Sequence, residues 1–375
     1  MSSLLDEQLE FVADRVRLEQ FRSAIARAVK PGDRVLDLGC GSGVLGLMCL
    51  DAGAGHVTAI DSSAIIDVAR ESLLRAGRGD RVSLIRGRSE QLELAPAVDL
   101  VICDHVGYFG FDYGVVEIIE DARRRLLRPG GTLIPSGIRL HIAAVGSHRC
   151  GEIVDSWLAP SIPPEFHWLR SYSVNTKHKV NLLPDEVLGP PAVLGEIDLY
   201  ADNPEFYSWN AEMQIERGGV VNGLAGWFEC ELAKDVWMTN SPLAHGPIQR
   251  PQALLPIAQA VPVKKGDVVK AAVMARPAEE LIAWVVEFPA SGKRYSHSTW
   301  QGMPISPETL IRAKPGHVPQ LSRGARARGI VLAYCDGKRT ARQVGQAVLR
   351  DHPDLFPSAA EISDFVLRVL RQDTE

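Results

Sequence analysis

Short apolar runs alternate with segments of helical periodicity over the first third of the chain. The runs are rich in the aliphatic and β-branched residues of buried strands, and the segments between them repeat apolar residues every three or four positions. The expected strands are 35–38, 56–60, 82–85, 98–103 and 132–134, and the expected helices are 7–29, 44–52, 64–76 and 116–127. This alternation predicts a doubly wound, Rossmann-like parallel sheet of the α/β class, with its ligand crevice at the carboxyl ends of the strands.

The pattern changes after about residue 140, where prolines cluster and short β-like runs replace the helical spacing. An antiparallel β-barrel domain is predicted by the runs 220–232, 253–261, 268–274 and 281–288. Helical periodicity then returns and predicts a small carboxyl-terminal domain with helices at 329–335, 340–350 and 358–371. The expected domains are therefore 1–140, 141–311 and 312–375.

The first expected strand leads into a glycine-rich turn, Asp37-Leu38-Gly39-Cys40-Gly41-Ser42-Gly43, and the second ends on Asp61. Glycines at this point bring backbone N–H groups close to a cofactor, and an acid at the end of the next strand accepts ribose hydroxyls. The turn therefore predicts a nucleoside-containing cofactor. A dinucleotide fingerprint needs a glycine where this chain has Val44, whereas the turn resembles the first motif of class I methyltransferases. S-adenosylmethionine is thus favoured over NAD.

Composition and charge narrow the possible partners. The 375 residues are 46% hydrophobic and 23% charged, as is typical of a globular protein with room for several domains. A net charge of −5 argues against nucleic acid as a partner. The six cysteines form no Cys-x-x-Cys pair, which indicates buried thiols in a reducing compartment and no metal. No apolar run approaches membrane-spanning length, so a cytoplasmic protein without a membrane partner is expected.

Three further stretches resemble one known family. Asp14-Arg15-Val16-Arg17 with Phe21, Asp61-Ser62-Ser63 and Gly87-Arg88-Ser89-Glu90 are similar to cofactor segments of the protein arginine methyltransferases, and the likeness covers about residues 8–290. The resemblance implies that Arg17 holds the cofactor carboxylate, Asp61 the ribose and Glu90 the adenine amino group, with S-adenosylhomocysteine as the product. The turn and these stretches, together with Asp104 at the carboxyl end of the strand 98–103, predict the cofactor-binding residues Arg17, Asp37, Gly39, Gly41, Gly43, Asp61, Ser62, Ser89, Glu90 and Asp104.

The loop after the strand at 98–103 departs from that family. The family grips a guanidinium with two glutamates nine positions apart, but here the first position is Asp104 and the second is Tyr113, with Asp112 beside it. The family's Thr-His-Trp motif is replaced by Ile248-Gln249-Arg250, with His245 nearby. A planar guanidinium needs two carboxylates in a fixed geometry, so arginine is predicted to bind poorly. The expected substrate-binding residues are Asp112, His245 and Gln249.

The same loop supplies the predicted catalytic residues. Methyl transfer needs an aligned, neutral nucleophile, so an amine acceptor must first lose a proton. Asp104 is expected to orient the amine and accept that proton with help from His105, while Tyr108 and Tyr113 shape the pocket. The alternative is that His105 and both tyrosines are only packed or solvated loop residues.

The stretch 329–340 and the two helices expected after it resemble the helical half of PqqD-type domains, which bind leader segments of ribosomally made peptides. The β-hairpin that usually precedes such helices is expected to be abbreviated or absent, because prolines 315 and 319 interrupt the preceding segment. The alternatives for this domain are a winged helix that contacts DNA and a helical cap on the barrel.

Three functions are compatible with these features. The first is an S-adenosylmethionine-dependent N-methyltransferase that acts on an amine of a precursor peptide captured through its leader. This combination resembles daptide-type enzymes, which dimethylate a C-terminal amine. The second is a divergent protein arginine N-methyltransferase, and the third is a non-enzymatic S-adenosylmethionine-binding regulator. The resemblance also implies a homodimer, with a dimerisation arm near residues 157–191.

Overall fold

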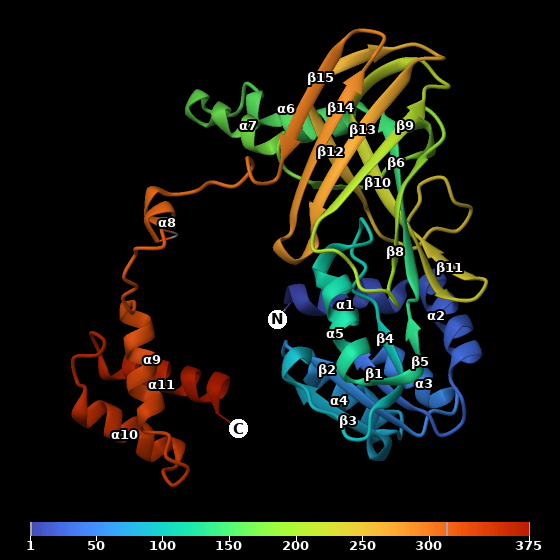
Figure 1. Cartoon of the computed structure of the whole chain (residues 1–375). Helices are drawn as coiled ribbons and strands as arrows, with labels where there is room; N and C mark the ends of the chain where they lie inside the picture. Colours follow the sequence, from blue (N-terminus) through green and yellow to red (C-terminus); the bar gives the residue numbers. More distant parts are fainter. Residues whose placement is uncertain (1, 313, 375) are drawn as a thin grey trace. The chain divides into compact units, whose positions relative to one another are not determined.

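The computed structural model describes residues 2–312 and 314–374. The chain divides into two compact units on either side of the Pro304–Ile305 junction (Figure 1). None of the described helices is both long enough and apolar enough to cross a membrane.

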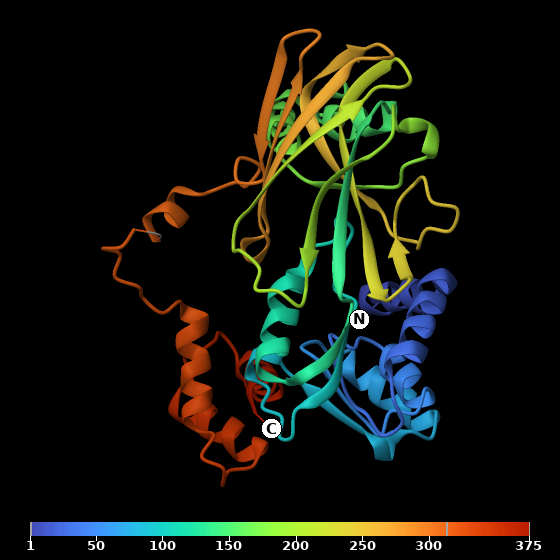
Figure 2. The ribbon, with the colours of Figure 1, turned by 45° about the vertical axis from the view of Figure 1, so that its right-hand side comes forward.

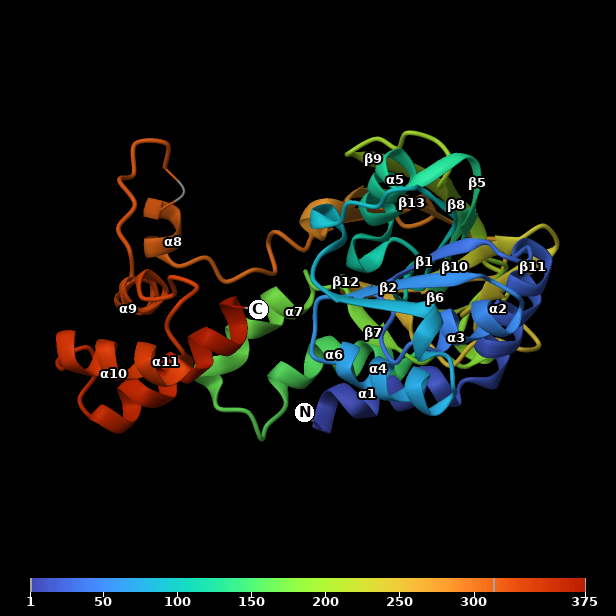
Figure 3. The same ribbon diagram turned by 90° about the horizontal axis from the view of Figure 1, so that it is seen from below.

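A five-stranded parallel sheet forms the amino-terminal part of the first unit, as predicted. Its strand order is β3-β2-β1-β4-β5, and Figure 3 shows β1 and β2 side by side. Helix α3 packs against β1 and β2, α4 against β3, and α5 against β4 and β5. The elements are β1 (Arg34–Leu38), α3 (Val44–Asp51), β2 (His56–Asp61), α4 (Ile66–Arg75), β3 (Val82–Arg86), β4 (Val98–Cys103), α5 (Val115–Arg125) and β5 (Leu127–Ile134). The order turns between β1 and β4, which places the ligand crevice at their carboxyl ends.

The amino-terminal helix differs from the prediction of one continuous helix over 7–29. The structure has two helices, α1 (Ser2–Ala13) and α2 (Arg15–Ala28), because Asp14 between them is extended, with φ −72° and ψ 92°. The Asp14 carboxylate accepts the backbone N–H of Arg17 at 3.1 Å and so caps α2. A capping acid inside an apolar periodicity was therefore the signal of a helix boundary.

Two antiparallel sheets make up the region that the sequence predicts as a β-barrel, here called the β-domain. The first has the order β7-β12-β10-β6-β8, with β11 paired to β10, and the second has the order β15-β14-β13-β9. Figure 2 shows both sheets above the parallel sheet. The strands are β6 (Gly137–Val145), β7 (His178–Val180), β8 (Ala192–Asp198), β9 (Tyr207–Gln214), β10 (Gly219–Ala233), β11 (Val236–Thr239), β12 (Gln252–Val263), β13 (Val268–Arg276), β14 (Leu281–Phe288) and β15 (Lys293–Ser298).

Short helices fill the connections of the first unit. Between β6 and β7 the chain leaves the sheet as a helical excursion made of α6 (His148–Asp155), η4 (Ser156–Leu158), η5 (Pro164–Leu169) and α7 (Arg170–Ser173). The remaining single 3-10 turns are η1 (Gly79–Arg81), η2 (Ser89–Gln91), η3 (Asp112–Gly114), η6 (Pro184–Glu186) and η7 (Pro277–Glu279).

The parallel sheet and the β-domain share one hydrophobic core. Phe109, in the loop after β4, is fully buried together with Phe228 of β10 and Trp284 of β14. A Cβ at Gly226 would lie 2.1 Å from the Phe109 ring, so only glycine lets β10 approach the loop this closely. The loop after β4 is therefore fixed by packing against the β-domain.

The second unit is a bundle of helices with a core of its own. Its helices are α8 (Pro307–Arg312), α9 (Arg323–Ala333), α10 (Ala341–Asp351) and α11 (Ala359–Asp373), and residues 305–312 and 314–374 contain no strand. Val331, Val348 and Ile362 are fully buried in this core. The first predicted helix, 329–335, in fact begins at Arg323, because the Ser322 hydroxyl caps it by accepting the N–H of Ala325 at 3.1 Å.

Candidate active site

The glycine turn holds Asp61 at the edge of a cleft. Gly39, Gly41 and Gly43 all have positive φ, which glycine adopts without strain, and Gly43 begins α3. The N–H of Gly41 donates to Asp61 Oδ2 at 3.1 Å, and the N–H and hydroxyl of Ser63 donate to Asp61 Oδ1 at 2.8 and 2.7 Å. The carboxylate is therefore fixed before any ligand binds.

The cleft beside this turn has a volume of about 220 Å³. Six residues singled out from the sequence line it: Gly39, Asp61, Ser62, Ser89, Glu90 and His105. Hydrogen bonding from Arg88 lowers the pKa of Glu90, so that this exposed carboxylate is ionised at neutral pH. Two carboxylate acceptors that line one open cleft fit the hydroxyls and exocyclic amine of an adenosine group.

Asp37 does not line this cleft. It is almost fully buried beneath the turn, where its Oδ2 accepts the N–H of Gly46 in α3 at 2.9 Å. Burial is the largest influence on this carboxyl and raises its pKa to about 7. Asp37 therefore joins β1 to α3, and its position supports the turn from below.

Asp104, which follows β4, lies in a buried cluster of charges. Its Oδ2 accepts from Arg17 Nε at 2.5 Å and from Arg250 Nη2 at 3.1 Å, and all three side chains are at most 10% exposed. Burial favours a raised pKa, but the two guanidiniums outweigh it and hold the pKa of Asp104 below its usual value. Both guanidiniums also lie over the Phe11 ring of α1, at 5.1 and 5.3 Å.

His105 connects the loop to the cofactor cleft. Its ring packs on the glycine turn so closely that a Cβ at Gly39 would lie 2.0 Å from Nε2. Burial lowers the pKa of His105, because the imidazolium would lose hydration. Asp104 Oδ1 and His105 Nδ1 are both buried and have no hydrogen-bond partner within the described part of the chain.

The second acid of the loop, Asp112, points inward. Its Oδ2 accepts the N–H groups of Tyr108 at 2.8 Å and Phe109 at 2.6 Å, and its Oδ1 forms an ion pair with Lys177. Tyr113 turns away from this acid, with φ 58° and half of its side chain exposed. Burial raises the pKa of Tyr108 above its usual value, so that its hydroxyl stays protonated.

Among the described contacts, neither the His245 nor the Gln249 side chain forms a hydrogen bond with Asp104 or Asp112. Both side chains are exposed, and Gln249 contributes its backbone N–H to Asp14 Oδ2 at 2.7 Å. The next residue, Arg250, contacts Asp104 instead and also donates to the Gly107 carbonyl at 3.2 Å. Within the triplet 248–250, the third residue rather than the second contacts the loop after β4.

A buried amide that sequence reasoning missed holds the loop against the β-domain. Asn240 is fully buried, and its Nδ2 donates to the carbonyls of Tyr108 at 2.9 Å and Pro251 at 2.7 Å. Its Oδ1 accepts the N–H of Phe228 at 3.0 Å. The sequence carried no signal for this role, because Asn240 and Tyr108 are 132 positions apart.

Known proteins resemble this chain over the region that contains the site. Residues 35–131 match the family model for a methyltransferase domain. The chain is 36% identical over 152 residues to a probable protein arginine N-methyltransferase 6 of Arabidopsis thaliana. This alignment covers 40% of this chain and 35% of that protein. It is 29% identical over 303 residues to protein arginine N-methyltransferase PRMT10 of Oryza sativa subsp. japonica, which covers 72% of this chain and 80% of that protein. The chain thus spans only about a third of the Arabidopsis relative.

Two solved structures share the fold. The PRMT1 enzyme–prozyme heterotetrameric complex with AdoHcy from Trypanosoma brucei has a TM-score of 0.69 at 20% identity and covers 78% of this chain and 96% of that one. Arabidopsis thaliana protein arginine methyltransferase 10 has a TM-score of 0.67 at 20% identity and covers 79% of this chain and 98% of that one.

Residues 35–131, which include the glycine turn and most of the parallel sheet, thus form a methyltransferase domain, and this supports an S-adenosylmethionine-dependent methyltransferase. The architecture of the chain, a parallel sheet followed by antiparallel sheets, is like that of the protein arginine methyltransferases, as the sequence indicated. The PqqD-like character predicted for the second unit gains no support from these matches.

Proposed function

We propose that this protein transfers methyl groups from S-adenosylmethionine to a nitrogen of a protein or peptide, as an N-methyltransferase of the arginine-methyltransferase type. The observation that carries the proposal is the pair of buried, unpartnered atoms at the carboxyl end of β4, Asp104 Oδ1 and His105 Nδ1, as far as the described residues extend. Such atoms are costly unless a ligand completes their hydrogen bonds. They lie where β4 meets the cofactor cleft, which is the expected place of the reacting groups.

The cofactor would be held by residues of the glycine-turn cleft. Asp61 offers its fixed carboxylate to the ribose hydroxyls, and Glu90 offers its ionised carboxylate to the adenine amino group. Gly39 lets the ligand approach the backbone at the end of β1. When bound, S-adenosylmethionine supplies an electrophilic methyl group on a sulfonium sulfur.

His105 is the proposed proton acceptor for the methylated nitrogen. Its lowered pKa keeps the imidazole neutral at pH 7, whereas the ion-paired Asp104 carboxylate is too weak a base for this step. The acceptor nitrogen forms a bond to the methyl carbon as the carbon–sulfur bond breaks, and its proton passes to the imidazole of His105, whose Nδ1 is buried without a hydrogen-bond partner among the described residues. Asp104 orients the acceptor through its Oδ1.

Two acceptor classes are supported by different observations. The names of the relatives favour arginine, the acceptor of the second function considered from the sequence. The charges of the loop favour an amine of a peptide instead, because Asp104 is paired with Arg17 and Arg250 and Asp112 with Lys177. An amine has one charge centre and does not need a fork of two free carboxylates.

Intact-mass measurement of two matched peptides would decide between them. One peptide carries a single arginine and a blocked amino terminus, and the other has that arginine replaced by glutamine and its terminal amine free. A mass gain of one or two methyl groups on the first supports arginine, and a gain on the second supports an amine. No gain on either peptide, together with no binding of S-adenosylmethionine by calorimetry, would overturn the proposed function.

The same measurement on a variant that ends at Pro304 tests the second unit. That unit has its own core, so its removal is expected to leave the first unit folded. If the second unit recognises a leader peptide, its removal should slow methylation of a peptide that carries the leader and should leave methylation of the same peptide without the leader unchanged. Equal rates with and without the second unit would contradict leader recognition.

We propose that residues 157–191, which begin within the helical excursion and include β7, form a dimerisation arm. Three of its apolar side chains are about half exposed, Leu158, Phe166 and Trp168, and they could be covered by a second copy of the chain. The Trypanosoma relative is described as a heterotetrameric complex, in line with assembly in this fold. Sedimentation of the full chain is expected to give a dimer that the Trp168→Asp variant weakens; a monomeric wild type would contradict the proposal.

A further inference from the structure

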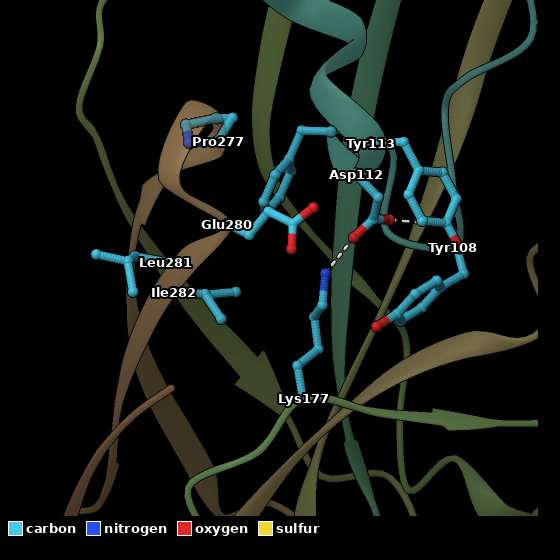
Figure 4. A pocket seen from close by; sticks show the side chains of 9 residues that line it. Tyr108, Asp112, Tyr113, Lys177, Pro277, Glu280, Leu281 and Ile282 are labelled. Atoms are coloured by element: carbon cyan, nitrogen blue, oxygen red, sulfur yellow. Dashed lines mark hydrogen bonds and ion pairs between the residues drawn. The ribbon is translucent and has the colours of Figure 1, made fainter. Parts of the chain in front are cut away.

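A second cavity, of about 130 Å³, lies beside the loop after β4 and shares no lining residue with the cofactor cleft. Tyr108, Phe111, Asp112 and Tyr113 of that loop form one wall, and the turn between β13 and β14 forms the other. Figure 4 shows Lys177 reaching between the two walls from the segment before β7. The cavity therefore joins three elements that are far apart in the sequence.

Backbone strain is concentrated at this cavity. Among the described residues, the non-glycine positions with positive φ are Tyr113 at 58°, Asp235 at 61° and Glu280 at 53°, and both Tyr113 and Glu280 line the cavity. Such conformations persist only where the surrounding structure imposes them, and they cluster at ligand sites. The two opposite walls are thus both held in unfavourable backbone conformations.

The walls have the chemistry of a cation site. Lys177 Nζ lies 4.6 Å from the centre of the Tyr108 ring and 5.8 Å from that of Phe111, and it pairs with the almost fully buried Asp112. In Figure 4 the Glu280 carboxylate points toward the same ammonium group from the opposite wall. Aromatic faces combined with carboxylates recognise ammonium and guanidinium groups.

We propose that Lys177 fills a cavity suited to an organic cation and, as an internal substitute, closes it to external cations. While Lys177 is in place, its charge neutralises Asp112, and a guanidinium or alkylammonium group is therefore expected to bind the cavity weakly. Lys177 is thereby a specificity-determining residue that keeps cationic side chains out of the site. That the cavity helps to select the methyl acceptor rests on the proposed function. Its binding of cations, however, can be measured without methyl transfer.

Asp112 is held in a way that makes the site testable. Its Oδ2 is fixed by the N–H groups of Tyr108 and Phe109, so the carboxylate stays in place when the partner of Oδ1 is removed. A buried carboxylate without its cation attracts a replacement strongly. Loss of Lys177 should therefore open a site for an external cation of similar charge.

Calorimetric titration of the full chain with methylguanidinium chloride, against sodium chloride as the salt control, tests this proposal. The Lys177→Ala variant is expected to bind methylguanidinium at least about tenfold more tightly than wild type and to be stabilised by it against heat. Lys177→Gln, which keeps a donor for Asp112 but no charge, is the second variant and should show a smaller gain in the same direction. Adding Asp112→Asn to Lys177→Ala should abolish the gain.

Lys179 provides the matched control. Its Nζ also lies over the Tyr108 ring, at 5.3 Å, but its contact is with the Tyr113 hydroxyl at 3.4 Å and not with an acid. Lys179→Ala removes the same charge and should leave methylguanidinium binding as in wild type. Equal affinities of wild type and both Lys177 variants would overturn the proposal, as would an equal gain in Lys179→Ala. Cation binding by the Lys177 variants, combined with a wild type that methylates neither peptide and does not bind S-adenosylmethionine, would uphold the site while contradicting the proposed function.

Discussion

Replacement of His105 by glutamine is expected to lower kcat for methyl transfer by about 10²- to 10⁴-fold, the usual contribution of a positioned general base. Glutamine keeps the size and polarity of the side chain but cannot accept the proton of the acceptor nitrogen. Binding of S-adenosylmethionine, measured by calorimetry, should change only slightly, because Asp61 and Glu90, the proposed contacts of the ribose and the adenine, are untouched. The combination of a large loss in kcat and retained cofactor affinity would identify a base.

The pH dependence gives a second readout for His105. Since burial lowers its pKa, the neutral imidazole that accepts protons is fully present at pH 7 and is lost only as the pH falls below the ordinary value of about 6.5. The acidic limb of the wild-type kcat/KM profile is expected below that pH and should vanish in His105→Gln. His148→Gln is the control, because His148 is 87% exposed on α6. An unchanged acidic limb in His105→Gln would assign the base to another group.

Replacement of Asp104 by asparagine is expected to reduce the free energy of unfolding by about 3–5 kcal/mol, the usual result of removing one partner of a buried ion pair. The change leaves the guanidiniums of Arg17 and Arg250 buried side by side without their shared counter-ion. Urea denaturation of the full chain would measure the loss. Combining Asp104→Asn with Arg250→Met should recover part of it, because only one unpaired guanidinium is then left.

Glu71→Gln is the matched control for this measurement. Glu71 pairs with Arg75 at 2.7 Å on the surface of α4, where the two side chains are 60% and 79% exposed. Exposed pairs of this kind contribute little, so the free energy of unfolding should change by less than about 1 kcal/mol. If Asp104→Asn cost no more than Glu71→Gln, the buried cluster would not be a source of stability.

The two loop acids together explain why the acceptor cannot be inferred from family likeness alone. Each acid is buried, and each is already neutralised by cations from distant parts of the chain. An arginine acceptor would have to compete with Lys177 at Asp112 and with two guanidiniums at Asp104. The acceptor therefore depends on contacts that no local motif contains.

Sequence reasoning succeeded for features that are decided locally. The strands and helices from 35 to 134 follow from apolar spacing, and the cleft residues Gly39, Asp61 and Glu90 follow from motifs whose members sit on neighbouring strand ends. The single helix expected over 7–29 was wrong, because the capping role of Asp14 competes with helix continuation. The structure exposes the side chains of Gln249 and His245 and brings Arg250 to Asp104 instead; these residues lie in the connection between β11 and β12, where no regular spacing indicates which side chain reaches the loop.

The sequence by itself determined the parallel sheet, the glycine-turn cleft and the likeness to a methyltransferase domain, because these depend on backbone preferences and on residues a few positions apart. Only the tertiary structure decided the charge state of the loop. Arg250 reaches Asp104 across 146 positions and Lys177 reaches Asp112 across 65, and such pairs form only after the β-domain has folded against the sheet. Burial then strengthens these contacts, because charges removed from water must be paired. The ion pairs of this loop are thus fixed by the packing of distant segments.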